Sequence, residues 1–306
     1  MFTEPNSKAR QDVVLARVSF IEDTPIFALE KPYMSLLPDD GTFPPTNCSF
    51  SSRRSTPIVD KRRTLSQLSL EENGFVIVPH PLRFRALATA IGEPHPPDHL
   101  LEYLHEVTDL VKAHLGAEKA ICIDWRFRKA SPKDSIDGFE DEDPVRHLHT
   151  HPAYKAHSDL SPQGGWMTLR AYLSEAELAM VEREKCRARV INSPAASSCW
   201  RPLVPVVNDC GLAYCRPNTV NAEDCIPYDR IDGSTGGEGT FLKPNDKQEW
   251  QWVSGQTCDE LSLFQSWDSS TGGFQGHTFH AAFWNPTWDG TGPQRESLEV
   301  RIIVLS

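Results

Sequence analysis

Residues 249–269, EWQWVSGQTCDELSLFQSWDS, decide the fold class of this 306-residue chain. Two short runs of aromatic and aliphatic residues, WQWV and LSLFQSW, are separated by a segment that contains Gly255 and Asp259. Runs of this length and composition are typical of β-strands joined by turns. The stretch therefore predicts short strands in an antiparallel arrangement.

The same pattern recurs elsewhere in the chain. Five more runs have it: AICIDWRF (120–127), WMTLRAYL (166–173), CWRPLVPVV (199–207), HTFHAAFW (277–284) and LEVRIIVLS (298–306). Two others, VVLARVSFI (13–21) and GFVIVPHP (74–81), precede them, on either side of a stretch rich in Pro, Ser and Asp. Many short apolar runs separated by Gly, Pro, Asn and Asp predict a β-sandwich or barrel.

Two helices are expected beside these strands. Residues 98–115 carry an apolar stripe at helical spacing, with Asp98 as the cap and Gly116 after the end. Ser174 and Glu177 have the spacing of a capping box, and this helix is expected to run through Cys186. The fold class is therefore mainly β with flanking helices, an α+β chain in which the helices support the sheet.

Composition excludes several classes of function. The net charge is −11, because 42 Asp and Glu residues outnumber 31 Lys and Arg residues, and a nucleic-acid partner is not expected. No apolar run approaches the roughly 20 residues that cross a bilayer, and the start of the chain does not resemble a signal peptide, so a cytoplasmic protein is expected. The eight cysteines form no CxxC pair and are expected to be reduced. The acidic segment at 133–144 is expected to be a solvated loop, and oligomeric state is not predicted.

Candidate metal ligands concentrate in HLHTHPAYKAHSDLS, residues 147–161. In an extended segment the alternating His147, His149 and His151 share one face, which permits a zinc site. His157 and Asp159 are also two residues apart, about 7 Å between Cα atoms in a strand. Two histidines and one carboxylate with open positions are diagnostic of non-haem Fe(II) oxygenases.

The second histidine for such a set has to come from a distant strand. His277 and His280, both in the HTFHAAFW run, are the candidates. Their spacing places them on opposite faces of a strand, so only one points inward. Spacing alone leaves this choice open.

Several segments together resemble the fungal hydroxylase/desaturase family of the aspergillic acid pathway type, which is similar to Fe(II)- and 2-oxoglutarate-dependent oxygenases. These segments are IVDKRRTLSQLSLEENGF (58–75), HLGAEKA (114–120), HSDLSP (157–162), WRPLVPVVNDCGLAYC (200–215), the 249–269 stretch, HAAF (280–283) and RESLEVRIIVL (295–305). The resemblance implies a double-stranded β-helix, also called a jelly roll or cupin-like core. It implies one domain over 1–306, with 1–70 as an arm with strands and about 120–306 as the core.

The resemblance also implies roles for individual residues. His157, Asp159 and His280 match the iron ligands, since His280 occupies the histidine position of the H-x-A-F segment. Arg295 and Ser297 resemble the R-x-S element that binds the distal carboxylate of 2-oxoglutarate. A guanidinium fork and a hydroxyl on one strand face suit a carboxylate.

Two further arginines are alternatives for cosubstrate contacts. Arg301 has the same parity as Arg295 and can take its place, or it can lie at the surface. Arg201, in WRPL, follows a segment, INSPAASSC, that departs from the family pattern. It is expected either to contact cosubstrate or substrate, or to anchor a loop by a salt bridge.

The implied function is a non-haem iron dioxygenase that uses Fe(II), 2-oxoglutarate and O2 to hydroxylate, desaturate or oxidatively cyclise a small secondary metabolite. Two alternatives remain open. One is a zinc-dependent hydrolase or lyase built on His147, His149 and His151. The other is a jelly roll that binds a ligand without turning it over.

Overall fold

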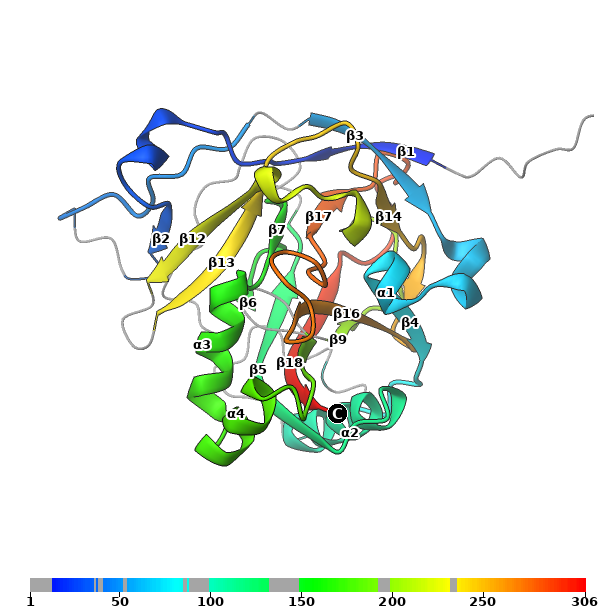
Figure 1. The fold of residues 1–306 in the computed structure, drawn as a ribbon. Helices are drawn as coiled ribbons and strands as arrows, with labels where there is room; N and C mark the ends of the chain where they lie inside the picture. Colours follow the sequence, from blue (N-terminus) through cyan, green and yellow to red (C-terminus); the bar gives the residue numbers. More distant parts are fainter. Residues whose placement is uncertain are drawn as a thin grey trace, which may run out of the picture.

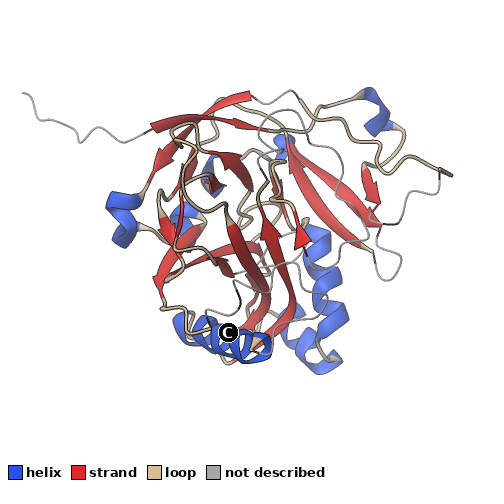
Figure 2. Ribbon diagram, turned by 180° about the vertical axis from the view of Figure 1, so that it is seen from behind, coloured by secondary structure: helices blue, strands red, loops and turns tan. Residues whose placement is uncertain are grey.

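The computed structural model describes residues 13–35, 37, 41–51, 54–84, 87, 99–131, 149–191, 199–231 and 236–306. Within these ranges the chain forms two curled sheets that face each other, with the longer helices gathered at one end (Figures 1 and 2). The acidic segment 133–144, Asp98 and His147 lie outside the described residues.

The larger sheet contains nine strands and holds the N-terminal strands together with strands from the last third of the chain. In spatial order they are β1 (Val13–Val18), β3 (Arg54–Asp60), β14 (Trp250–Trp252), β11 (Cys210–Cys215), β17 (His280–Trp284), β7 (His157–Ser158), β13 (Gly237–Leu242), β12 (Cys225–Ile231) and β2 (Tyr33–Ser35). Only the β3–β14 and β12–β2 pairs are parallel. The expected antiparallel architecture is therefore present.

The smaller sheet contains seven strands and faces the centre of the larger one. Its members are β4 (Phe75–Pro79), β16 (Glu260–Asp268), β8 (Ala188–Ile191), β18 (Glu296–Leu305), β5 (Lys119–Lys129) and β6 (His149–Thr150), with β9 (Cys199–Pro202) paired to β16 and β18. A separate short pair is formed by β10 (Val206–Val207) and β15 (Gln256–Thr257). The 249–269 stretch thus supplies strands to both sheets.

The helices cap the strands rather than interrupt them. They are α1 (Leu70–Asn73), α2 (Leu100–His114), α3 (Pro162–Tyr172) and α4 (Glu175–Glu182), with 3-10 turns η1 (Pro25–Ala28), η2 (Arg62–Gln67), η5 (Pro217–Thr219) and η6 (Ala222–Asp224). Two of these match the expected helices. Their ends differ from the prediction.

Residues 166–173 were expected to be a strand, and this prediction was wrong. They form most of α3, which begins where the Ser161 side chain accepts a hydrogen bond from the Gly164 amide and Pro162 fills the first turn. Trp166 and Leu169 then lie on one helical face and pack against Trp267. A helix start signal of this kind outweighs the short apolar run.

The other two helices, α2 and α4, are present, but their ends differ from the predicted ones. Helix α2 has His99 at its N-cap position, without a side-chain cap, in place of the expected Asp98. The capping box of Ser174 and Glu177 is confirmed, but α4 ends at Glu182 and does not reach Cys186. The cause is Glu184, whose φ of 56° is left-handed and incompatible with a continuing helix.

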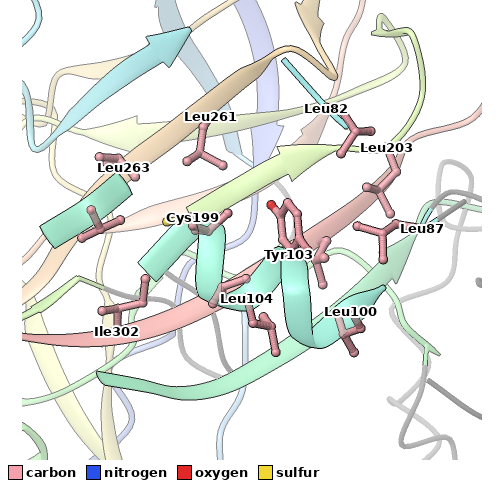
Figure 3. Close-up of a cluster of buried hydrophobic side chains, with 14 of the residues drawn as sticks. Leu82, Leu87, Leu100, Tyr103, Leu104, Cys199, Leu203, Leu261, Leu263 and Ile302 are labelled. Atoms are coloured by element: carbon pink, nitrogen blue, oxygen red, sulfur yellow. The ribbon is translucent and has the colours of Figure 1, made fainter. Parts of the chain in front are cut away.

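Helix α2 supports the outer face of the smaller sheet, as expected. Its buried residues Leu100, Tyr103, Leu104, Val107 and Val111 pack against alternate residues of β18, namely Leu298, Val300, Ile302 and Val304 (Figure 3). Because one parity of β18 faces α2, the other parity, which holds Ser297, Glu299 and Arg301, faces the interior between the sheets. The functional residues lie on that interior face.

The outer face of the larger sheet is covered by the first strand. Ala16 and Val18 of β1 belong to the same buried cluster as Ala281 and Phe283 of β17. Strand β17 is therefore buried on both faces. In the part of the chain that is described, none of the helices is long and apolar enough to pass through a membrane.

Candidate metal centre

The metal centre is built from two neighbouring strands of the larger sheet. His157 lies in β7, Asp159 follows that strand directly, and His280 is the first residue of β17. His157 and His280 are direct cross-strand partners, and their ring centroids are 4.4 Å apart. Because Asp159 is two residues after His157 along an extended chain, the two side chains point to the same side of the sheet.

Three ligand atoms converge without protein partners. Oδ1 of Asp159 is 3.7 Å from Nε2 of His157 and 3.7 Å from Nε2 of His280, and one ligand atom from each residue lies within 4.8 Å of the others. All three residues are at most 3% exposed, and none of these three atoms has a hydrogen-bond partner. Buried polar atoms are almost always satisfied, so this gap fits a metal ion.

The remaining polar atoms of the three residues are held by the protein. Nδ1 of His280 donates to the carbonyl of Thr278 at 3.0 Å, and Nδ1 of His157 donates to the carbonyl of Lys155. Each ring therefore presents the lone pair of Nε2 toward Asp159. The other carboxylate oxygen of Asp159, Oδ2, accepts from the Ser266 hydroxyl at 2.9 Å.

Burial sets the charge state of this group. It lowers the pKa of His280 to about 4, and it lowers the pKa of His157 well below its usual range, with His280 acting in the same direction. Both rings are thus neutral at neutral pH. Burial raises the pKa of Asp159 well above its usual range, although Arg301 and Ser266 oppose this. A cation would offset the cost of that buried carboxylate.

The rival histidine has a different place. His277 is buried, but its Nδ1 donates to the carbonyl of Leu160 at 3.1 Å and it is not part of the ligand group. It fixes the backbone just after Asp159. Of the two candidates, His280 is the one that reaches the centre.

His151, the HLHTH histidine whose side chain the structure describes, is not part of this group. His151 is exposed, and its backbone carbonyl accepts from Nη1 of Arg128 at 2.7 Å. His149 belongs to β6 by its backbone, while its side chain and His147 lie outside what the structure describes.

Arg295 and Ser297 lie together on the interior side of the smaller sheet. Both are buried, and Nε of Arg295 donates to the Ser297 hydroxyl at 3.4 Å. The guanidinium stacks over Trp200 at 4.8 Å, and its Nη1 donates to the carbonyls of Cys210 and Gly211, both at 3.4 Å. The long distances leave room for a stronger acceptor, such as a carboxylate.

Arg201 is fully buried and bonded throughout. Its Nε donates to the Tyr103 hydroxyl at 3.0 Å, and its Nη1 donates to the carbonyls of Cys258 and His80 at 2.6 and 2.8 Å. Its Nη2 contacts Nδ1 of His80. This network ties α2 to the turns at 80 and 258, which suits the anchoring alternative, although no carboxylate is among these partners.

Arg301 lies at the opposite end of the interior from Arg295. It is 6% exposed, and its charge acts on Asp159. Between the two ends, Nε of Arg128 donates to Glu299 at 2.6 Å in a buried ion pair, and Arg128 acts on the charge state of both histidine ligands.

Sequence reasoning missed Ser266, Arg128 and Glu299. A signal was available for Glu299, because Ser297, Glu299 and Arg301 are polar at every second position of an otherwise apolar run. No comparable signal marks Arg128, whose partner is 171 residues away.

Comparison with known proteins agrees with this site. The model of the family described as "Oxidoreductase/YMDC permease-like domain" matches residues 19–305. The gibberellin cluster GA4 desaturase of Gibberella fujikuroi is 26% identical over 83% of this chain and 87% of its own length. The Fe(II)/2-oxoglutarate-dependent dioxygenase nvfI of Aspergillus novofumigatus is 27% identical over 80% and 81%, respectively.

A third relative is the hydroxylase/desaturase CTB9 of Cercospora beticola, 26% identical over 82% of this chain and 76% of its own. A solved structure of the iron and alpha-ketoglutarate-dependent endoperoxidase NvfI matches with a TM-score of 0.76, at 23% identity, over 96% of this chain and 98% of the other. The expected jelly-roll fold is thus confirmed, as is the likeness to fungal hydroxylases and desaturases. The chain belongs to the Oxidoreductase/YMDC permease-like domain family, among the fungal dioxygenases, hydroxylases and desaturases that it resembles.

Proposed function

We propose that this protein is an Fe(II)- and 2-oxoglutarate-dependent oxygenase that hydroxylates, desaturates or oxidatively cyclises a small secondary metabolite. The observation that carries the proposal is the convergence of the unsatisfied ligand atoms of His157, Asp159 and His280. The names of relatives, which include Fe(II)/2-oxoglutarate-dependent dioxygenases and a desaturase, support the same chemistry.

The protein supplies ligands and orientation to this reaction. When bound, iron, 2-oxoglutarate and O2 together supply the oxidising power that removes hydrogen from a C–H bond. Two neutral imidazoles and one carboxylate, from His157, His280 and Asp159, would hold the iron and leave coordination positions for the cosubstrate. Carbonyls at Lys155 and Thr278 prevent the two rings from turning.

Arg295 and Ser297 are the proposed contacts for the distal carboxylate of 2-oxoglutarate. The guanidinium is buried and held flat by Trp200, so its fork is oriented before the cosubstrate arrives. Tyr214 pairs directly with His280 across the sheet and stacks on Phe75, with ring centroids 4.1 Å apart, so a buried aromatic pair supports this part of β17.

The state of the thiols supports a proposal for the compartment. All eight cysteines are free, and burial raises the pKa of five of them, at positions 122, 199, 210, 215 and 225, to about 11 or above. Unpaired, unreactive thiols suit a reducing compartment, and the cytoplasm is our proposal.

Anaerobic addition of Fe(II) and 2-oxoglutarate to the full chain tests the function. A weak visible charge-transfer band is expected with the wild type and is expected to vanish in Asp159→Ala. His151→Ala, at an exposed histidine six residues before His157, is the matched control and retains the band. A protein that shows no band, or one in which His149→Ala alone abolishes metal binding, contradicts the proposal and favours the zinc alternative.

A further inference from the structure

A β-bulge interrupts β16 beside the metal centre. The register with β8 changes between Gln265, which pairs with Ile191, and Trp267, which pairs with Val190. Ser266 is therefore the extra residue, without a partner of its own in β8. An extra residue of this kind bends the strand and changes the direction of the side chains around it, and such bulges are frequent next to active sites.

Two successive side chains of the bulge reach the same segment of the chain. The Ser266 hydroxyl donates to Oδ2 of Asp159 at 2.9 Å, and Nε1 of Trp267 donates to the carbonyl of Pro162 at 3.1 Å. In a regular strand, neighbouring side chains point to opposite faces. The bulge thus lets β16 hold both ends of the segment that runs from Asp159 to Pro162.

The backbone between these two points is held as well. The carbonyl of Leu160 accepts from Nδ1 of His277 at 3.1 Å and from the hydroxyls of Ser158 and Thr240 at 3.3 and 3.4 Å. All four of these residues are at most 2% exposed. Because the backbone next to Asp159 is fixed, the main freedom left to this residue is rotation of its carboxylate group.

The Ser266 hydroxyl restricts that rotation and makes the two carboxylate oxygens different. Oδ1 lies 3.7 Å from Nε2 of both His157 and His280 and has no hydrogen-bond partner. Oδ2 accepts from Ser266, which is fully buried, so bulk water does not compete for this contact. A carboxylate without such a contact binds a metal through one oxygen or through both.

We propose that Ser266 is a positioning residue that makes Asp159 a monodentate metal ligand. Its hydroxyl keeps Oδ2 away from the metal, so that Oδ1 alone joins the two histidines. The inference rests on the proposed oxygenase function, because a chelating cosubstrate and O2 need the open positions of the metal. A bidentate carboxylate would fill one of these positions.

The test compares Ser266→Ala with Ser262→Ala in the full chain. Ser262 is a matched control, since it is also fully buried in β16 but bonds to Gln256 and not to Asp159. Metal-free protein is titrated with Co(II), and binding is followed by visible absorption. Ser266→Ala is expected to bind Co(II) about 10-fold more weakly than the wild type, and Ser262→Ala to stay within about 2-fold of it.

Infrared spectroscopy supplies a readout that a purely structural role would not change. In the difference spectrum of Co(II)-loaded and metal-free protein, the two carboxylate stretching bands lie further apart for monodentate than for bidentate binding. Carbon-13 labelling of aspartate identifies these bands. Wide spacing is expected for the wild type and for Ser266→Thr, which keeps a hydroxyl, and narrow spacing for Ser266→Ala.

Urea unfolding of the metal-free variants checks that each of them folds. Wild-type affinity and wide band spacing in Ser266→Ala overturn the inference and leave the oxygenase proposal intact. An equal loss of affinity in Ser262→Ala, or a weaker affinity with unchanged spacing, also overturns it. Narrow spacing in Ser266→Ala, from a protein whose wild type gives no charge-transfer band with Fe(II) and 2-oxoglutarate, supports the role of Ser266 and contradicts the oxygenase instead. A wild type that binds no Co(II) overturns both proposals.

Discussion

Strand β18 (Glu296–Leu305) has arginines toward both ends of its interior face, and the two ends differ in what surrounds them. Arg295, just before the strand, is 1% exposed and enclosed by Trp200 and the carbonyls of Cys210 and Gly211. Arg301 is also buried, but it faces a cavity of about 480 Å³ that α3 and the β12–β13 hairpin border. One strand thus presents the same functional group to a closed space and to an open one.

The difference indicates how one strand can bind two kinds of molecule, one of fixed size and one of variable size. A cosubstrate of fixed size suits the closed end, where an aromatic ring holds the guanidinium in place before binding. A ligand of variable shape suits the open end, because helix and hairpin residues there can change without disturbing the sheets. The candidate metal ligands His157, Asp159 and His280 belong to the larger sheet, which faces this strand.

The largest expected effect comes from the closed end. Arg295→Leu should weaken 2-oxoglutarate binding at least 100-fold, which corresponds to about 3 kcal/mol, because a buried, charge-assisted fork is lost. Titration of the anaerobic charge-transfer band measures this affinity. Arg295→Lys keeps the charge and loses the fork, so about a 10-fold loss is expected. An unchanged affinity in both variants would remove the closed end from cosubstrate binding.

The open end depends on close packing of α3. A Cβ atom at Gly164 would lie 2.1 Å from the backbone oxygen of Glu238, so Gly164→Ala should destabilise the fold by about 3 kcal/mol. Gly272→Ala, where nothing lies within 4 Å of the added atom, is the matched control and should cost under about 0.5 kcal/mol. Urea unfolding at equilibrium compares the two. Similar midpoints would show that α3 does not need this contact.

Arg201 is a third buried arginine, and a variant of its partner Tyr103 tests whether it supports the fold or binds the cosubstrate. Tyr103→Phe removes the hydroxyl that accepts from Nε of Arg201 and should destabilise the protein by about 1–2 kcal/mol, because a buried donor is left unpaired. The affinity for 2-oxoglutarate should stay the same. A change in that affinity without a change in stability would instead place Arg201 among the cosubstrate contacts.

The smallest effect on 2-oxoglutarate binding is expected for a variant at the open end. Arg230→Gln, at the open end, should leave the affinity for 2-oxoglutarate within about 2-fold of the wild type, because Arg230 lines the cavity at Arg301 and not the surroundings of Arg295. The same anaerobic titration gives the number. A loss as large as that of Arg295→Lys would mean that the open end holds the cosubstrate.

Much of the fold is predictable because β-runs and their turns are local signals. The strands around Trp250, Phe264 and Val300 follow from alternating or continuous apolar residues. Helix α3 was missed because its apolar face is short and Gly164 and Gly165 lower helix propensity. Those glycines are present for tertiary reasons: added Cβ atoms would meet the Glu238 backbone and the Trp267 ring.

Less of the candidate metal centre than of the fold is predictable from local sequence patterns. The H-x-D pair is a local pattern, whereas the choice of His280 over His277 required the resemblance to a family. The reason is structural: His280 begins a strand paired to β7, whereas His277 lies three residues earlier, outside any strand. Partners such as Ser266 and Arg128 depend on contacts more than 100 residues apart along the chain, which no local pattern encodes.

The order of the strands also affects how the protein folds and when it can bind its metal. His157 and His280 are adjacent in space but 123 residues apart in sequence, and β3 must pair with β14, which lies about 190 residues later. Folds dominated by such distant pairings form slowly, since long loops close before their contacts stabilise them. During synthesis, the nascent chain carries His157 and Asp159 for the whole time that the ribosome takes to reach His280. The complete set of three ligands is therefore available only after the ribosome has passed His280, and metal loading reports on a step that follows the pairing of β7 with β17.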